Sequence, residues 1–420
     1  MKSQGLKILI LSSYDVGGAS IAAIRLHLAL LKAGVQSRLL TLHKSGGNIP
    51  EHYQYQPQAG WKSKIELKFR QRAEHQQKNS LHLPKGQSLS GEFSMPLASY
   101  DITDSHHWKW ADVVNIHWVN EWISLENLVA KAGQKPMIWT MHDMHAFTGG
   151  CHYSHSCLGF EMECNNCPML IHSSIPQLAN QFWKSKKTAL YVHQPKLRIV
   201  APSQWMVDLA AKSSLFSEFT GSRIFNSLDT SVFKPLPQEM CAAVLGLPGN
   251  KKIMLSVIQS LKDRRKGFFI LIEALKKVPD PENWVLCTVG KLHDETTEIG
   301  VEHIHLGSIQ DERLMAIVYN SAHVFVHPAT EDNLPNVVVE ALCCGLSVAG
   351  FQIGGMPEMV IQGENGILTN NISPEGLLNA IKETSAIQSR KTQIAEAAHQ
   401  TFSGSEHVKQ FLQVAEQLVG

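Results

Sequence analysis

The segment His327–Gly355 constrains the fold of this chain more than any other part of the sequence. An apolar run at Ala322–Val326 leads into it. A polar loop, an apolar stretch at helical spacing and a second apolar run at Leu346–Gly350 follow. This order predicts a strand, a loop, a helix, a second strand and a glycine turn at Gly354–Gly355. In such a unit the carboxyl ends of parallel strands and the helix N-terminus face one crevice, where open α/β sheets bind ligands.

The predicted loop and helix carry groups that suit a sugar nucleotide. The helix opens at Pro335, and a helix N-terminus attracts phosphate through its free N–H groups and its dipole. Glu331 and Asp332 lie in the loop and Glu340 in the helix, and carboxylates accept hydrogen bonds from sugar hydroxyls. A helix with an acidic N-terminus and no ligand would show the same residues, so a purely structural role is the alternative.

The acidic residues also carry a resemblance to a known family. Asp332 and Glu340 are separated by seven residues, and the run EDNLPNVVVEA resembles the E-x7-E signature segment of family 4 glycosyltransferases. The first acidic position falls on Asp332 with Glu331 directly before it, and either residue could take that role. The resemblance implies that the first acid orients the hydroxyls of the transferred sugar and that Glu340 binds the nucleotide ribose. It also assigns three further residues to donor binding, Asn336, Gly354 and Gly355.

A basic turn follows the predicted strand Lys252–Val257. Family 4 enzymes commonly place an Arg a few residues before a Lys-Gly pair, and both cations bind the donor diphosphate. Lys266 and Gly267 match the pair with Arg265 beside them. Ser260 stands near the earlier Arg position, and either Arg264 or Arg265 could replace that Arg. The resemblance therefore implies that Arg265 and Lys266 clamp a diphosphate directly, and no catalytic metal is expected. A solvated basic turn is the alternative.

The N-terminal region reads as the start of a second parallel sheet. A strand at Lys7–Leu11, a helix at Ile21–Ala33 and a strand at Ser37–Leu42 form a βαβ pattern. The turn between the first two contains Gly17 and Gly18, which let a ligand approach the backbone closely. It lacks the spacing of a dinucleotide fingerprint, which argues against a tightly held NAD. It resembles the first-turn glycine loop of GT-B enzymes, which lies near the donor phosphates and the acceptor.

Two predicted strands, Asp112–His117 and Pro136–Thr140, end in polar and aromatic residues. The run IWTMHDMHAFTGGC around the second strand resembles a segment of bacterial exopolysaccharide glycosyltransferases of the colanic-acid type. In family 4 a His at this strand end sits beside the transferred sugar, and that position is His142 here. His117 on the adjacent strand is a weaker candidate. A structural histidine at a strand end is the alternative.

A cysteine cluster follows, with four cysteines within 17 residues. In a chain without a secretion signal, such a cluster favours a structural, tetrahedral zinc site over disulfides. His152 or His155 could replace one of the ligands. Reduced thiols, a disulfide, and an iron–sulfur or redox role are the alternatives. The four residues are Cys151, Cys157, Cys164 and Cys167.

The length of 420 residues exceeds what one core usually holds, so two domains are expected. The run RIFNSLDTSVFKP at Arg223–Pro235 resembles the family's interdomain connector and is rich in turn residues. The predicted division is an acceptor-side domain at residues 1–235, a nucleotide-sugar domain at 236–402, and a helix within 403–420 that crosses back. The resemblance implies an α/β protein of the GT-B fold, with two Rossmann-like doubly wound domains facing a central cleft.

The bulk properties exclude several classes of protein. A net charge of +1 does not favour a nucleic-acid partner, and no apolar run is long enough to span a membrane. The apolar run Leu6–Leu11 is too short for a signal peptide, so a cytoplasmic location is expected. The basic, partly amphipathic segment Gly60–Gln77 is either a solvated surface helix or a peripheral contact with the inner face of a membrane.

Together these features are typical of a retaining glycosyltransferase of the hexosyltransferase type. The resemblance implies a nucleoside-diphosphate sugar as the donor, a glycan or lipid-linked acceptor, and a role in cell-surface polysaccharide and cell wall biosynthesis. A sugar-nucleotide epimerase of the same fold is one alternative. A catalytically degenerate member that binds sugar nucleotides as a scaffold is the other.

Overall fold

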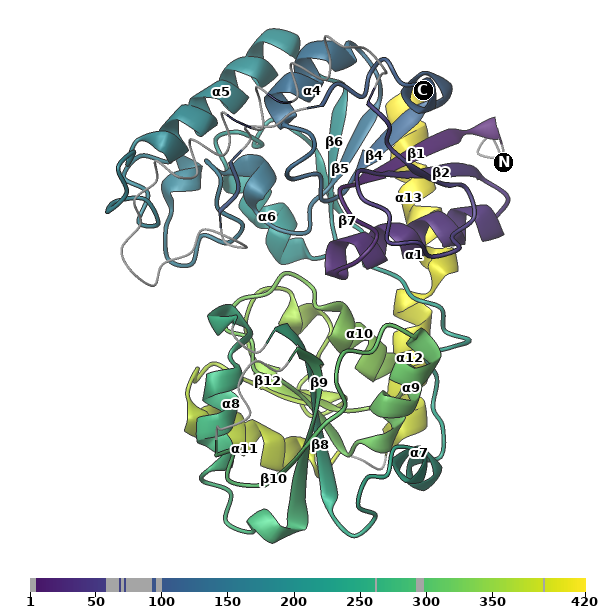
Figure 1. The fold of residues 1–420 in the computed structure, drawn as a ribbon, viewed down its shortest axis with the longest axis vertical. Coiled ribbons are helices and arrows are strands. Elements are labelled where there is room, and N and C mark those ends of the chain that lie inside the picture. The colour runs from purple at the N-terminus through teal and green to yellow at the C-terminus, as the bar shows by residue number, and fades with distance from the viewer. Residues whose placement is uncertain are drawn as a thin grey trace. The chain divides into compact units, whose positions relative to one another are not determined.

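The computed structural model divides the chain into two compact units (Figure 1). Unit 1 comprises Met1–Ile224 and His407–Gly420, and unit 2 comprises Phe225–Glu406. The first boundary lies at the start of the connector rather than near Leu236. The predicted amphipathic segment Gly60–Gln77 lies outside the described residues, apart from two single positions. The described residues are 5–57, 68, 72, 93–95, 100–260, 263–291, 298–387 and 390–420.

Unit 1 contains a parallel seven-stranded sheet with the order β3-β2-β1-β4-β5-β6-β7. The order reverses between β1 and β4, so this is the topological switch point, where open α/β sheets bind ligands. Leu9 pairs with Val114 across it. The strands are β1 Lys7–Ser12, β2 Gln36–Thr41, β3 His52–Gln54, β4 Val113–Ile116, β5 Met137–Thr140, β6 Leu197–Ala201 and β7 Gly221–Arg223.

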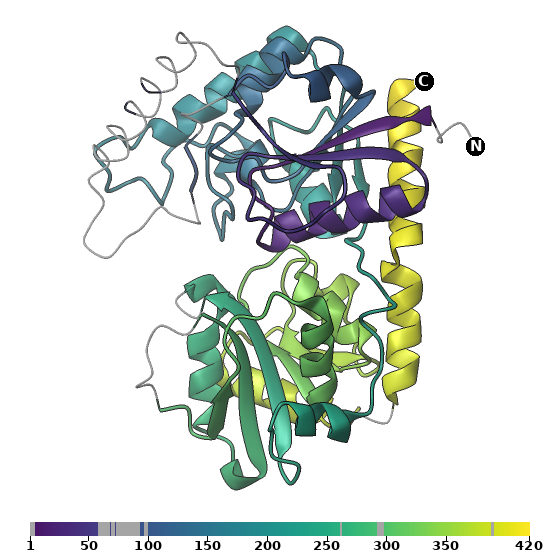
Figure 2. The same cartoon turned by 45° about the vertical axis from the view of Figure 1, so that its right-hand side comes forward.

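The strands of unit 1 are apolar on both faces because helices cover both sides of the sheet. On one face, α1 and α13 pack against alternate strand residues such as Ile8 and Ile10. On the other face, α4, α5 and α6 cover the next residues in register, including Leu9 and Leu11. Figure 2 shows α13, in yellow, beside the purple strands near the N-terminus. The helices are α1 Gly18–Lys32, α3 His106–Trp110, α4 Leu125–Ala132, α5 Leu178–His193, α6 Gln204–Lys212 and α13 Gly404–Val419.

Unit 2 contains a parallel six-stranded sheet with the order β10-β9-β8-β11-β12-β13. This is the order of a doubly wound nucleotide-binding sheet, with the switch point between β8 and β11. Phe325 pairs with Leu255 across it. The strands are β8 Lys252–Ser260, β9 Trp284–Lys291, β10 Glu302–His305, β11 Val324–His327, β12 Val348–Phe351 and β13 Gly366–Thr369.

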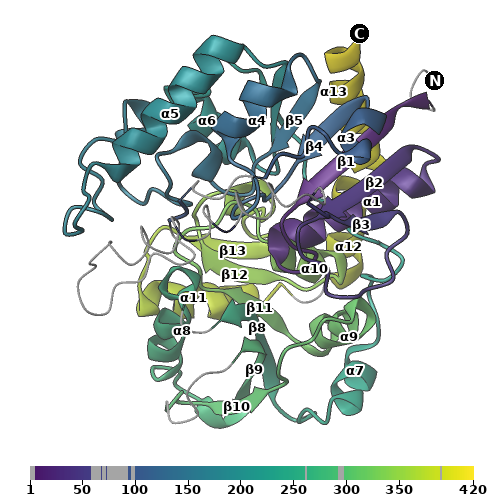
Figure 3. The same cartoon turned by 45° about the horizontal axis from the view of Figure 1, so that its top comes forward.

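Helices cover both faces of this sheet as well (Figure 3). One apolar cluster joins α8 and α11 to the sheet, and another joins α7, α9, α10 and α12 to its opposite face. The helices are α7 Gln238–Val244, α8 Phe268–Leu275, α9 Glu312–Ser321, α10 Asn336–Cys343, α11 Pro374–Thr384 and α12 Lys391–Phe402. Among the described residues, no helix combines the length and apolarity needed to cross a membrane. The expected α/β architecture with two Rossmann-like sheets is confirmed.

Candidate functional site

Two loops meet at the switch point of unit 2. After β8 the chain forms a short 3-10 turn at Arg264–Lys266, and after β11 it forms the loop that leads into α10. The backbone N–H of Thr330 donates a hydrogen bond of 2.8 Å to the carbonyl of Arg265, which ties the loops together. The predicted order of strand, loop, helix and strand in this segment is confirmed, and the helix begins directly after Pro335.

Two glycines allow these loops to pack so closely. Gly267 has a φ of +68°, and a Cβ there would lie 1.8 Å from the carbonyl oxygen of Pro328. Gly354 has a φ of +50°, and a Cβ there would lie 1.7 Å from the carbonyl oxygen of Asp332. Both positions therefore require glycine for the backbone angle and for the space. The predicted glycine turn supports the backbone of the acidic loop, and Gly355 N–H donates to the carbonyl of Asn333 at 2.8 Å.

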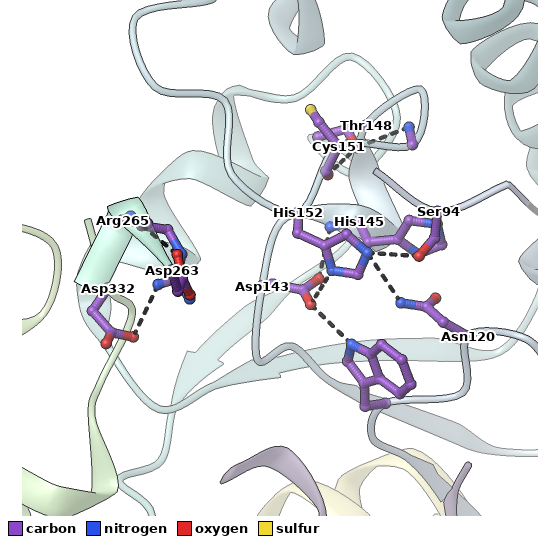
Figure 4. A network of polar contacts seen from close by, with 12 residues as sticks. Ser94, Asn120, Asp143, His145, Thr148, Cys151, His152, Asp263, Arg265 and Asp332 are labelled. Carbon is purple, nitrogen blue, oxygen red and sulfur yellow. Dashed lines mark hydrogen bonds and ion pairs between the residues drawn. The ribbon is translucent and has the colours of Figure 1, made fainter. Parts of the chain in front are cut away.

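The acidic loop and the basic turn form one charged cluster. Lys266 Nζ lies 2.5 Å from Asp332 Oδ2, and Arg265 Nη1 lies 3.9 Å from Asp332 Oδ1 (Figure 4 shows Arg265 and Asp332). Arg265 also donates 2.8 Å to the carbonyl of Glu331, whereas the neighbouring Arg264 is exposed. The structure thus brings together both predicted cations and Asp332.

The charge state of this cluster follows from its surroundings. Burial raises the pKa of Asp332, but the Lys266 ammonium, the contact with His327 and the Arg265 guanidinium outweigh it and lower the pKa overall. Burial lowers the pKa of His327, whose Nε2 lies 3.5 Å from the same carboxylate. Near neutral pH the cluster therefore holds an ionised Asp332 beside cations, with an uncharged imidazole next to it.

The second signature acid lies on α10 with its carboxylate buried. Glu340 Oε2 accepts a hydrogen bond of 2.8 Å from the hydroxyl of Tyr319 on α9. Asn336, the first residue of α10, accepts 3.0 Å at Oδ1 from the side-chain amide of Asn226 in the connector. The predicted donor residues of α10 are therefore held by neighbouring elements of the same unit.

In unit 1, His142 follows β5, is partly buried, and stands in a row with two buried polar side chains, His117 and Asn115. His142 Nε2 lies 2.8 Å from His117 Nδ1, and His117 Nε2 lies 2.9 Å from the amide of Asn115 on β4. Burial lowers the pKa of His142 to about 4, and burial followed by its neighbour His142 lowers that of His407 on α13 to about 4. The two sequence candidates at the strand ends, His142 and His117, are therefore in direct contact and uncharged at neutral pH.

The residue after His142 organises a second network (Figure 4). Asp143 Oδ2 lies 2.6 Å from His152 Nδ1 and accepts 3.2 Å from the indole N–H of Trp118. His152 Nε2 in turn lies 2.8 Å from the hydroxyl of Ser94. Burial raises the pKa of Asp143, but its contact with His152 outweighs burial and lowers the pKa overall. This network ties the β5 loop to the segment that begins the cysteine cluster.

The predicted glycine turn of unit 1 lies at its switch point, after β1. Gly17 has a φ of +94° and precedes α1, and Gly18 is the first residue of that helix. Among the residues that the structure describes, no side-chain cap is found on this helix. The structure therefore places Gly17 and Gly18 at a helix N-terminus that could hold a phosphate.

The four clustered cysteines are free thiols in the loop before α5. Backbone N–H groups point at two of them, from Gly149 to Cys164 Sγ at 3.1 Å and from Gly159 to Cys157 Sγ at 3.4 Å. Within the described ranges, no three His, Cys, Asp or Glu side chains are arranged to hold a metal ion. Zinc on Cys151, Cys157, Cys164 and Cys167 stays a prediction from their spacing.

Comparison with known proteins shows a similarity to glycosyltransferases. Residues 239–401 match the model of the family described as Glycosyl transferases group 1. Over 391 residues the chain is 25% identical to an Escherichia coli (strain K12) protein that carries the provisional name colanic acid biosynthesis glycosyl transferase WcaC, a match covering 91% of this chain and 89% of that one. The lipopolysaccharide core biosynthesis glycosyltransferase LpsE of Rhizobium meliloti (strain 1021) is 29% identical over 166 residues, which span 39% of this chain and 48% of that protein.

Solved structures share the fold along nearly the whole chain. Sucrose-phosphate synthase from Thermosynechococcus elongatus has a TM-score of 0.64 at 19% identity, covering 98% of this chain and 99% of that one. Anabaena Alr3699/HepE in complex with UDP and glucose also has a TM-score of 0.64, at 18% identity over 98% and 100%. The two doubly wound sheets and these similarities define the GT-B class of fold. Within unit 2, residues 239–401 are similar to the group 1 glycosyl transferases.

Three residues of these networks were not anticipated from the sequence. Tyr319 contacts Glu340, His407 neighbours His142, and Asp143 joins Trp118 to His152. Only His407 left a signal, because it shares a helix face with Phe411 and Ala415, at spacings of four residues. The other two are contacts between separate elements, which no local pattern shows.

Proposed function

We propose that this protein transfers a sugar, with retention of anomeric configuration, from a nucleoside-diphosphate sugar to a glycan or lipid-linked acceptor in cell-surface polysaccharide biosynthesis. The observation that carries the proposal is the cluster of Lys266, Arg265 and Asp332 at the switch point of unit 2, whose residues 239–401 are similar to the group 1 glycosyl transferases. Similarity to proteins named for colanic acid and lipopolysaccharide core biosynthesis supports the pathway class.

In the proposed reaction, the bond between the anomeric carbon and the diphosphate oxygen breaks, and its electron pair stays on the diphosphate. The acceptor hydroxyl oxygen forms the new bond to the same face of that carbon, and its proton passes to the departing diphosphate. Lys266 and Arg265 stabilise the charge that develops on the leaving group, so no catalytic metal is required. Glu340 binds the ribose hydroxyls, and Asp332 or Glu331 orients the sugar.

His142 and the glycine turn at Gly17–Gly18 are proposed to serve the same reaction from unit 1. His142 is uncharged near neutral pH, and the contact of its Nε2 with His117 Nδ1 fixes the orientation of its imidazole. Gly17 and Gly18 lie at the start of α1, and the dipole of a helix N-terminus favours a phosphate there.

The proposal is tested by transfer and binding assays on the full chain. UDP-, GDP-, ADP- and CMP-sugars are screened for an increase in melting temperature, starting with UDP-glucose, and the donor found is then used with glycan and lipid-linked acceptors. A ligand at tenfold above its Kd should stabilise the fold by about 1.4 kcal/mol. Glu340→Ala should abolish the shift and the transfer, whereas Glu364→Ala, at an exposed position of the same unit, should keep both.

Three results would overturn the proposal in different ways. Near-wild-type turnover of Glu340→Ala would remove the assigned donor site. Conversion of the sugar nucleotide without any acceptor, giving an epimeric sugar, would favour an epimerase. Donor binding with no turnover on any acceptor would favour a scaffold.

A further inference from the structure

The ion pair between Lys266 and Asp332 raises a problem of charge. Lys266 and Arg265 are the partly buried cations of the turn, and two carboxylates, Asp332 and Asp263, lie against them. Arg265 Nη2 is 3.5 Å from Asp263 Oδ2, and the formal charges of these four side chains cancel. A diphosphate that binds here therefore meets cations whose charges Asp332 and Asp263 already neutralise.

Asp332 is fixed in this position by more than the ion pair. Its Oδ1 accepts 3.0 Å from the backbone N–H of Asn333, and Gly354 packs against its carbonyl oxygen. Its side chain is buried, so the carboxylate cannot rotate into solvent without leaving these partners. A phosphate that contacts Lys266 therefore lies close to a fixed negative charge. In this partly buried setting like charges repel more strongly than in water.

The strength of this repulsion depends on the charge of the phosphate. In a sugar nucleotide each phosphate has one ester bond and shares the bridging anhydride oxygen, so each carries one negative charge. In the free nucleoside diphosphate the terminal phosphate carries about −1.5 to −2 near pH 7. Asp332 therefore disfavours the product more than the donor, because the additional charge falls on the phosphate that the sugar has just left.

We infer that Asp332 is an internal counter-ion of the diphosphate clamp that lowers the affinity for the free nucleoside diphosphate relative to the donor. The inference rests on the proposed function. In this inference Asp332 makes the site discriminate between the donor and the product, and so promotes release of the product. This role is in addition to any contact of Asp332 with the sugar.

The test compares matched pairs of ligands on the full-length protein. Binding of UDP and UDP-glucose, ADP and ADP-glucose, and GDP and GDP-glucose is measured by calorimetry at pH 7.5, and the pair that binds the wild type is kept. Asp332→Asn, which has nearly the same shape, should bind the free diphosphate at least about tenfold more tightly and the sugar conjugate less than about threefold more tightly. At pH 5.5 the ratio of diphosphate affinity to sugar-conjugate affinity in Asp332→Asn should approach the ratio in the wild type at the same pH. The reason is that the terminal phosphate protonates near pH 6 and loses its additional charge.

Three variants serve as controls. Asp332→Glu keeps the charge and should keep the wild-type ratio. Asp263→Asn removes the more exposed carboxylate beside Arg265 and should change the ratio by less than about threefold. Adding Lys266→Gln to Asp332→Asn should remove the gain in diphosphate affinity, because the double variant lacks the Lys266 ammonium that binds the phosphate. Should Asp332→Asn fold poorly, Asp332→Glu and the wild type still give the pH dependence of the ratio.

The outcomes separate the two proposals. Equal gains for donor and product, or no gain for the product, would overturn the role of Asp332 and leave the donor site standing. A pH-independent ratio in the wild type and in Asp332→Glu would do the same. Wild-type protein that binds none of the six ligands would overturn both the proposed function and this inference.

Discussion

The hydroxyl of Tyr319 donates a hydrogen bond to the carboxylate of Glu340, with 2.8 Å between Oη and Oε2. Tyr319 is completely buried in the core formed by α9, α10 and β11, and its ring packs against Phe325 at a centroid distance of 5.7 Å. The orientation of a predicted ribose-binding carboxylate is therefore set by a residue of the hydrophobic core.

Tyr319→Phe should weaken donor binding although the residue touches no ligand. The change keeps the ring packing but leaves the buried Glu340 oxygen without this donor, so the free energy of unfolding should fall by about 1 kcal/mol. We expect KM for the donor to rise about three- to tenfold with a smaller change in kcat. Steady-state kinetics and urea unfolding check this. Glu340→Gln is the matched comparison, and an unchanged KM in Tyr319→Phe would contradict the positioning role.

Gly354→Ala should be far more destabilising than a comparable change nearby. The added Cβ would meet the carbonyl oxygen of Asp332 at 1.7 Å, and the φ of +50° is unfavourable for Ala. We expect a loss of at least about 2 kcal/mol in the free energy of unfolding. Gly363→Ala has a φ of +75° but open space around its Cβ, so it should cost only about 1 kcal/mol. If urea unfolding gave equal losses of unfolding free energy for Gly354→Ala and Gly363→Ala, the close approach of Gly354 to the Asp332 carbonyl would have no effect on stability.

Unit 1 should lose stability in mild acid because of its buried histidines. Burial lowers the pKa of His407 to about 4, whereas in the unfolded chain the value is near 6.5. Between these values the unfolded state binds more protons, so stability is full above about pH 6.5 and falls as the pH drops toward 4. Each such group contributes up to about 1.4 kcal/mol per pH unit in this window.

His407→Gln should therefore flatten the acid limb of stability. Eight of the nine tryptophans lie in unit 1, so the change is followed by tryptophan fluorescence during thermal unfolding. His193→Gln, at an exposed position of the same unit, should leave the acid limb as in the wild type. An acid limb that His407→Gln does not alter would contradict the assignment.

The spacing of the cysteine cluster predicts about one structural zinc ion per chain. Elemental analysis of protein purified without added metal would test this, and removal of zinc by a chelator should lower the melting temperature of unit 1. Cys167→Ser should lose the metal, whereas Cys241→Ser in unit 2 should retain it. Metal-free protein with all its thiols reactive would instead support the reduced cluster.

Much of the fold could be predicted from the sequence because buried parallel strands are short apolar runs. β1, β6, β11 and β12 are of this kind, and so is the helix that carries Glu340. The edge strand β7 has the sequence GSR and no apolar signal. α5 was missed because Lys186 interrupts its apolar face. This lysine is buried and donates 2.6 Å to the carbonyl of His145.

The site could be predicted only where its residues lie in one local segment. Asp332 and Glu340 lie in such a segment, and a family pattern covers both. Two features of the site depend on how two loops meet in space. Lys266 pairs with Asp332, and Arg265 rather than Arg264 points inward. Sequence spacing contains no information on that meeting.

The assignment of His407–Gly420 to unit 1 has a consequence for synthesis on the ribosome. Unit 2 is one continuous stretch of chain, whereas unit 1 needs residues from both sides of it. Val408, Phe411, Ala415 and Leu418 complete the apolar layer against α1, including Leu26 and Leu30. Until they emerge, that layer faces water. Unit 1 is therefore completed last, and a chain released after residue 406 would carry a complete unit 2 and an unfinished unit 1 whose uncovered apolar layer promotes aggregation.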